Sequence, residues 1–263
     1  PDDSISSTMA FDEWIDVSIE KDGLWLRIYI NGQFSNEVEL PYNPTGPVDP
    51  AGWMIGRYTY SGGDTPAFFY GLIDRFVVTR AAKYGGTSFT PSTDTPGPSD
   101  PFWDDVVIAL DLSGSEGSTT ITDIKGLSTW TAWGGAHITT SDGVTGGSCL
   151  SLDGAGDYLS CPINAYNSIT SDWTVDVCVK MPVGAVPTGE IWTYGQVEAA
   201  SHGHGLAGNV SAGEIWMRGF VGANPPSLLP IGIVDSIETA PPVWDMNPAH
   251  IIYKCLTSTD QGA

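Results

Sequence analysis

The sequence has few basic residues. Ten lysines and arginines stand against 31 aspartates and glutamates, which gives a net charge of −21. Binding to nucleic acid or to an anionic membrane surface needs clustered positive charge, so this balance argues against both kinds of partner. No apolar run approaches the roughly 18 residues of a membrane-spanning segment, and no basic, apolar signal segment opens the chain. We expect no nucleic-acid partner and no membrane insertion.

Cysteine is also scarce, and no C-x-x-C spacing occurs, which makes a zinc site improbable. Cys149 and Cys161 could face each other across a predicted hairpin, but a shift of one residue in register puts them on opposite faces. The sequence favours buried free thiols over disulfides because neither the register nor the redox compartment is fixed. The disulfide state stays open for all four cysteines: Cys149, Cys161, Cys178 and Cys255.

Residues that build long helices are underused. Charged residues make up only 16% of the chain, whereas it contains 32 glycines and 19 prolines. That composition is typical of many short strands joined by turns. Apolar residues at 41%, with 10 Trp, 10 Tyr and 8 Phe, can supply a sizeable core. The chain starts at Pro1 without a methionine, so we expect a fragment or a processed product.

Residues 14–34 show the clearest strand pattern. Apolar and polar residues alternate from Ile15 to Glu20 and again from Leu24 to Ile30, and turns at Asp22-Gly23 and Asn31-Gly32 follow them. This pattern predicts an antiparallel pair in which each strand has one core face and one solvent face.

The stretch G-G-S-C-L-S-L-D-G-A-G-D-Y-L-S-C at residues 146–161 predicts a β-hairpin. Leu150 and Leu152 mark its first strand, Tyr158 and Leu159 its second, and the turn lies between them. We expect the chain to be organised around this hairpin. Further strands are predicted at residues 72–79, 106–112, 129–133, 173–179, 191–194, 215–220 and 250–256.

Four motifs carry a resemblance to a known family: the stretch just described, W-T-V-D at 173–176, G-L-I-D-R-F at 71–76 and K-Y-G-G-T-S-F-T-P at 83–91. Together they resemble the laminin-G-like, concanavalin A-like jelly-roll family, in the form found in bacteriophage tail and virion proteins. The resemblance implies an all-β fold, an antiparallel jelly-roll β-sandwich.

The linker S-T-D-T-P-G-P-S-D-P at residues 92–101 marks a predicted domain boundary. Residues 1–91 resemble the closing half of a first jelly roll, and residues 102–263 the opening part of a second. Three arrangements remain open: a window on a longer tandem protein, one circularly permuted sandwich, or strand exchange between subunits. The strand that pairs with residues 250–256 would distinguish them.

Asp74 is the first candidate for an inorganic role. By alternation it shares a strand face with Phe76 and Val78, so its carboxylate points toward the interior and needs a partner. Backbone N–H groups or a Ca²⁺ ion could supply it. In the predicted turn, Asp153 and Asp157 could likewise make local turn hydrogen bonds or bind Ca²⁺.

Catalysis would most plausibly be glycoside hydrolysis, which needs two carboxylates held close together. Glu190, Glu198 and Glu214 are isolated in the sequence, so we expect no enzymatic activity. The letters G-H-G-L-A-G at 203–208 match a nucleotide-binding pattern but lack its strand and helix context, and predict a loop.

Aromatic residues on predicted strands are the remaining functional signal, because exposed rings can stack on sugars. The candidates are Trp130, Trp133, Trp192, Tyr194 and Trp216.

The resemblance implies a non-enzymatic component of a phage virion, a tail fibre or a tail or capsid decoration, on the extracellular face of the particle. Its partners would be other virion subunits or copies of itself, with a host-surface glycan as a possible ligand. Two alternatives remain: a secreted or cell-surface carbohydrate-binding adhesin module, and a glycoside hydrolase of the concanavalin A-like fold.

Overall fold

The computed structural model describes residues 11–39, 52–57, 68–92, 96–144, 147–169, 171–182 and 189–195 in full, and the backbone of 203–209 and 214–220. The chain divides into a compact unit, Pro1–Ile233, and a C-terminal unit, Val234–Ala263, that lies outside the described residues. Among the described residues, no helix is long and apolar enough to cross a membrane.

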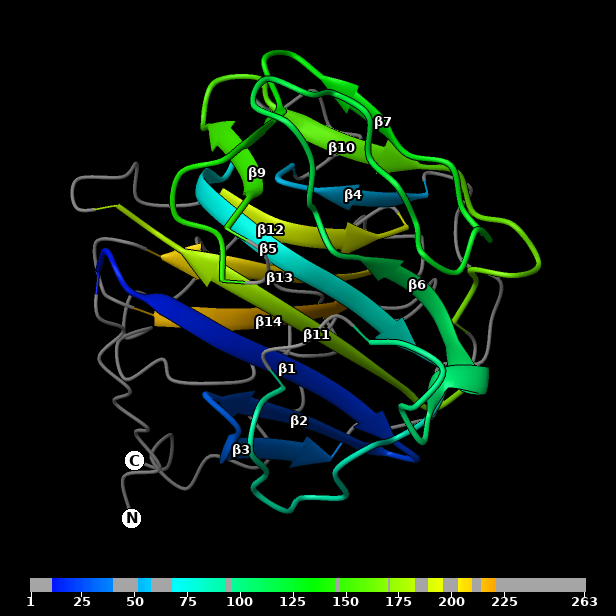
Figure 1. The fold of residues 1–263 in the computed structure, drawn as a ribbon. Coiled ribbons are helices and arrows are strands. Elements are labelled where there is room, and N and C mark those ends of the chain that lie inside the picture. The colour runs from blue at the N-terminus through cyan, green and yellow to red at the C-terminus, as the bar shows by residue number, and fades with distance from the viewer. Residues whose placement is uncertain are drawn as a thin grey trace, which may run out of the picture. The chain divides into compact units, whose positions relative to one another are not determined.

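The first unit is an all-β sandwich of two antiparallel sheets, which lie one behind the other in Figure 1. The front sheet has eight strands in the order β3-β2-β1-β11-β5-β9-β8, with β6 also pairing with β5. Their bounds are β1 Trp14–Asp22, β2 Trp25–Ile30, β3 Gln33–Glu39, β5 Tyr70–Thr79, β6 Val106–Leu110, β8 His137–Thr139, β9 Cys149–Asp153 and β11 Trp173–Lys180.

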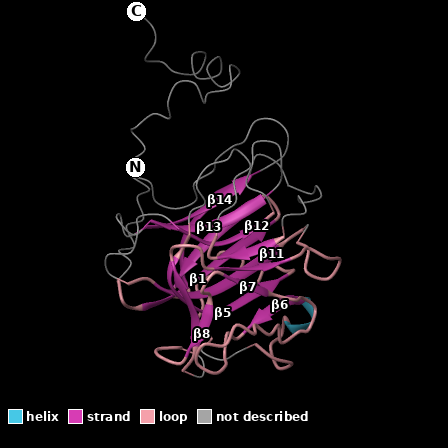
Figure 2. Cartoon of the chain, turned by 90° about the horizontal axis from the view of Figure 1, so that it is seen from above, coloured by secondary structure: helices cyan, strands magenta, loops and turns pink. Residues whose placement is uncertain are grey.

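The second sheet has six strands in the order β14-β13-β12-β4-β10-β7. These are β4 Trp53–Ile55, β7 Thr131–Trp133, β10 Tyr158–Cys161, β12 Gly189–Tyr194, β13 Gly203–Asn209 and β14 Glu214–Phe220. Within the described residues the one helical element is the short 3₁₀ turn Trp103–Asp105, which stands at one end of the strands in Figure 2.

The predicted pair at residues 14–30 is confirmed as β1 and β2, which pair from Val17↔Ile30 to Asp22↔Trp25. The Asn31-Gly32 turn then leads into β3, a strand that the sequence pattern had not indicated. Both turn residues have positive φ angles, 50° and 73°, as the two central residues of a type I′ turn require.

The predicted hairpin at residues 146–161 is wrong. Its two strands form, but β9 pairs with β5 and β8 in the front sheet, whereas β10 pairs with β4 and β7 in the other. The turn between them is therefore a corner that carries the chain across the core. Both strands direct leucines to that core. The local sequence pattern is therefore the same whether the two strands pair with each other or with strands of two different sheets.

Strands from both sides of residues 92–101 interleave in both sheets. In the front sheet β11 lies between β1 and β5, and in the other β4 lies between β10 and β12. In the described part of the chain, the segments before and after the linker thus build one sandwich together. Residues 250–256 lie outside the described residues, so the division of the whole chain into domains stays a prediction.

A continuous apolar core fills the space between the sheets. Trp53, Phe76, Trp173 and Trp192 lie at its centre with side chains at most 1% exposed, and neighbouring rings meet at centroid distances of 5.9–6.5 Å. Such offset and edge-to-face contacts add to the free energy gained by burying the rings.

The residues G-H-G-L-A-G, for which a loop was predicted, lie in β13, which pairs with β12 and β14. The backbone pairing on both sides explains how a glycine-rich stretch forms a strand here despite its low intrinsic preference.

Candidate functional site

Asp74 lies on the outer face of the front sheet, not among the core residues. An extra residue, Arg75, bulges between Asp74 and Phe76 opposite the Cys178–Val177 step, and its φ angle is 54°. The bulge reverses the alternation, so the prediction that Asp74 shares the face of Phe76 and Val78 is wrong. Ile73 and Phe76 both point into the core instead.

Asp74 belongs to a row of alternating carboxylates and thiols across four strands. Asp16 is opposite Cys178, Cys178 is opposite Asp74, and Cys149 precedes Leu150, the residue opposite Ile73. Burial raises the pKa of the Cys149 thiol to about 12, and the Asp74 carboxylate adds to the rise. The described cysteines are buried free thiols, as the sequence favoured.

Asp153 and Asp157, in the turn between β9 and β10, accept hydrogen bonds from backbone N–H groups. Asp153 Oδ1 accepts the Ala155 N–H at 2.7 Å, and Asp157 accepts N–H groups from Gly135 and Asp153. These hydrogen bonds are the local turn chemistry that the sequence offered as one of two roles for these carboxylates. Among the described residues, no group of three or more His, Cys, Asp or Glu side chains is placed to hold a metal ion.

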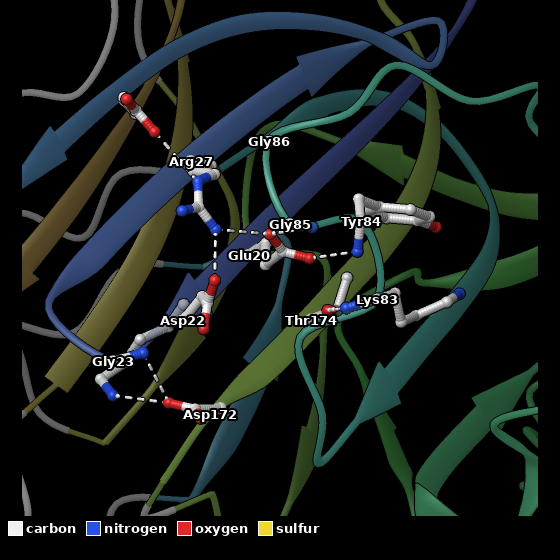
Figure 3. Close-up of polar contacts among 12 residues, drawn as sticks. Glu20, Asp22, Gly23, Arg27, Lys83, Tyr84, Gly85, Gly86, Asp172 and Thr174 are labelled. Carbon is white, nitrogen blue, oxygen red and sulfur yellow. Dashed lines mark hydrogen bonds and ion pairs between the residues drawn. The ribbon is translucent and has the colours of Figure 1, made fainter.

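A covering segment, residues 81–92, lies over the outer face of the front sheet and buries its polar side chains. Glu20 is fully buried and accepts the backbone N–H groups of Tyr84 and Gly85 at 2.5 and 3.0 Å (Figure 3). It also accepts from Tyr29 Oη and from an Arg27 terminal nitrogen, both at 3.1 Å. The expectation of a solvent face on β1 is thus wrong, because this segment replaces the water.

A second polar group under the same segment centres on Asp176. Its carboxylate accepts from Ser18 Oγ at 2.6 Å, Lys83 Nζ at 2.8 Å and Tyr84 Oη at 2.9 Å. Arg75 pairs with Asp16 beside it. Asp16, Glu20 and Asp176 each have a basic or hydroxyl partner on this face, so these contacts fix the segment to the sheet.

A pocket of about 60 Å³ remains beside these residues. Ligand sites for drug-sized molecules have several hundred Å³, so this volume suits a few water molecules and not a sugar. The lining consists of Asp16, Arg75, Val77, Lys83, Tyr84, Phe89, Pro91, Ser92, Pro96, Asp100 and Asp176.

Three of the five candidate aromatic residues are buried. Trp130, Trp192 and Tyr194 belong to the core cluster, where they cannot contact a sugar. Trp216 lies on β14 opposite Ala207, and its side chain is outside the described residues.

Trp133 is different, because 48% of its surface is exposed on the outer face of the six-stranded sheet. It pairs across β7 and β10 with Tyr158, and the two rings are nearly parallel, at 8° with centroids 5.8 Å apart. A hydrogen bond of 2.9 Å from Nε1 to Ser160 Oγ fixes the indole. The result is a flat aromatic surface held in one orientation.

Arg57 completes this surface. Its guanidinium lies 4.6 Å from the centroid of the Tyr158 ring and 5.9 Å from that of Phe68. Neither Arg57 nor Tyr158 was among the binding residues predicted from the sequence. The alternation Tyr158-out, Leu159-in could have indicated the tyrosine, but Arg57 follows a strand of three residues and reaches the surface only through tertiary pairing.

We name the group Trp133, Tyr158, Phe68 and Arg57 the aromatic surface. It can stack against the apolar face of a sugar ring and offer a charged donor at its side.

The chain matches no protein-family model and no curated protein sequence.

Proposed function

We propose that the protein is a non-enzymatic, carbohydrate-binding β-sandwich that serves as a structural component of a phage virion and contacts glycans of the host surface. The carbohydrate-binding part rests on one observation: Trp133, nearly half exposed, is stacked on Tyr158 and fixed by Ser160. Because the rings are already oriented, a sugar would bind without ordering them, which lowers the entropic cost of binding.

The virion part rests on the resemblance of the sequence motifs, and its partners are other virion subunits or copies of the same chain. Two of those motifs have a structural role. G-L-I-D-R-F forms the centre of β5, and K-Y-G-G-T-S-F-T-P forms the covering segment. A secreted or cell-surface adhesin would use the same aromatic surface, and only the location of the protein would differ.

The test is a glycan array that includes bacterial surface polysaccharides, probed with the wild-type protein and with Trp133→Ala. We expect the wild type to bind a subset of glycans and Trp133→Ala to bind none, with its melting temperature nearly unchanged. If the wild type binds no glycan while it still assembles into particles, the protein is architectural and the carbohydrate-binding proposal is wrong.

A further inference from the structure

We infer that the glycan recognised by the aromatic surface is acidic, and that Arg57 binds its carboxylate while Trp133 and Tyr158 stack on its rings. This inference rests on the proposed function, and it adds the chemical class of the ligand. The observation behind it is the set of contacts that the Arg57 guanidinium makes in a chain with an excess of acidic residues.

The other described basic side chains all donate to oxygen atoms. Those that pair with carboxylates are Lys21, Arg27, Arg75, Lys83 and Lys180, and those that donate to backbone carbonyls are Arg80 and Lys125. Arg57 alone among the described lysines and arginines has neither kind of partner among the described residues. Its Nε is buried without a hydrogen bond, and its charged group contacts the faces of Tyr158 and Phe68.

The position of Arg57 is fixed from its backbone. Gly56, with a φ angle of 85°, turns the chain out of β4, and Arg57 then forms a bridge with Phe68. The Arg57 carbonyl accepts Thr193 Oγ1 at 3.3 Å. The arginine is thus held at the side of the aromatic rings by groups other than its own charge.

A guanidinium stacked on a ring has lost part of its hydration, and the attraction of the ring offsets only part of that cost. Its planar set of donors matches the two oxygens of a carboxylate better than it matches any neutral hydroxyl group. A uronic or sialic acid residue would bring such a carboxylate on a ring that can stack on Tyr158 and Trp133.

Two described carboxylates lie near the aromatic surface. Glu190, whose backbone forms a bridge with Phe68, is buried with only 3% of its surface exposed. Asp157, the carboxylate next to Tyr158 in the sequence, is occupied by the N–H groups of Gly135 and Asp153. Charges more than about 8 Å away are largely screened at physiological ionic strength, so the contact of the ligand with Arg57 decides the preference.

The experiment compares matched pairs of sugars: oligogalacturonate, oligomannuronate and sialyllactose, each against its methyl ester, with a neutral glycan array alongside. Binding is measured by titration calorimetry at physiological salt for the wild type, Arg57→Met, Trp133→Ala and the control Lys125→Met. Arg57→Met keeps most of the side-chain length and removes the charge, and Lys125→Met makes the same change in net charge away from the aromatic surface.

We expect the wild type to bind at least one acid about tenfold or more tightly than its ester, since a charge-assisted hydrogen bond distinguishes them. Arg57→Met should lose this preference and bind acid and ester equally weakly, Lys125→Met should keep it, and Trp133→Ala should bind neither form. A wild type that binds neutral glycans but no acid, or an Arg57→Met protein that keeps the preference, overturns the inference and leaves the proposed function standing. Failure of the wild type to bind any sugar, acidic or neutral, overturns the proposed function itself.

Discussion

The two outer faces of the sandwich differ in what covers them. On the eight-stranded sheet, the covering segment buries Glu20, Asp176 and their partners and leaves only a small pocket. On the six-stranded sheet, Trp133 stays nearly half exposed beside Tyr158 and Arg57.

Charged groups are usually exposed and aromatic rings are usually buried, and these two faces show the opposite arrangement. Charged groups are buried on the first face, where every one of them needs a partner, and an aromatic ring is exposed on the second. A buried, fully bonded carboxylate such as Glu20 is a structural element. An exposed, oriented ring beside an arginine that has no acidic partner among the described residues is the surface that we propose for a ligand.

Removing Glu20 should destabilise the covered face of the eight-stranded sheet more than any other change considered for it. In Glu20→Ala, the Tyr29 hydroxyl and two backbone N–H groups lose their acceptor in a buried place, and Arg27 keeps only Asp22 and Glu37 of its three carboxylate partners. We expect the free energy of unfolding to fall by about 3–5 kcal/mol, measured by urea denaturation.

Glu37→Ala is the matched control, because Glu37 also binds Arg27 but its side chain is 40% exposed. Its loss should cost less than about 1 kcal/mol. Equal effects of the two substitutions would show that Glu20 is not buried under the covering segment in solution.

Gly32→Ala should loosen the covering segment at its contact with the Asn31-Gly32 turn. Gly32 has a φ angle of 73°, its carbonyl accepts the Phe89 N–H at 2.7 Å, and an added Cβ would lie 2.1 Å from the Phe89 carbonyl oxygen. We expect a loss of more than about 2 kcal/mol, with faster hydrogen exchange at residues 84–89.

Gly23→Ala controls for backbone strain alone. Gly23 has a similar φ angle of 60° but nothing within 4 Å of the added atom, so about 1 kcal/mol is expected. If Gly32→Ala costs no more than Gly23→Ala, the segment does not pack on the Asn31-Gly32 turn.

On the exposed face, Trp133→Ala should change stability by about 1 kcal/mol or less, because it removes one partly exposed ring contact. Trp130→Ala, three residues earlier, removes a buried indole and should cost about 3–5 kcal/mol. Thermal and urea unfolding of both variants checks this contrast, and a large loss in Trp133→Ala would mean that the ring serves the fold.

The smallest effect concerns pH. Burial, with the Asp176 carboxylate next to it, raises the pKa of Tyr84 above its ordinary value of 10.0. The folded state therefore keeps the proton that the unfolded state releases, and stability falls as the pH rises above 10. Tyr84→Phe should show a shallower fall than the wild type in unfolding measured from pH 9 to 11, and parallel curves would contradict the burial of this hydroxyl.

Much of the fold could be predicted from local pattern. The alternation around Ile15 and Ile28, and the apolar patterns at residues 173–179 and 72–79, predicted strands that the structure contains. The same pattern identified Trp133 as a candidate among five aromatic residues.

Alternation could not decide the partners of those strands. The stretch at residues 146–161 reads equally well as a hairpin and as a corner between sheets, and the bulge at Arg75 reverses a face without any mark in the local pattern. Nor could it show that residues 83–91 would bury the polar face of β1, or that Arg57 would lie against Tyr158.

The sequence by itself determined a chain of short strands with a large aromatic core, because strand period and composition are local properties, and the β-sandwich was implied by the resemblance of its motifs. Only the tertiary structure decided which polar residues are buried, which tryptophan is exposed and which arginine lies against aromatic rings. Those outcomes depend on contacts between residues far apart in the chain, such as Glu20 with Tyr84, or Arg57 with Tyr158.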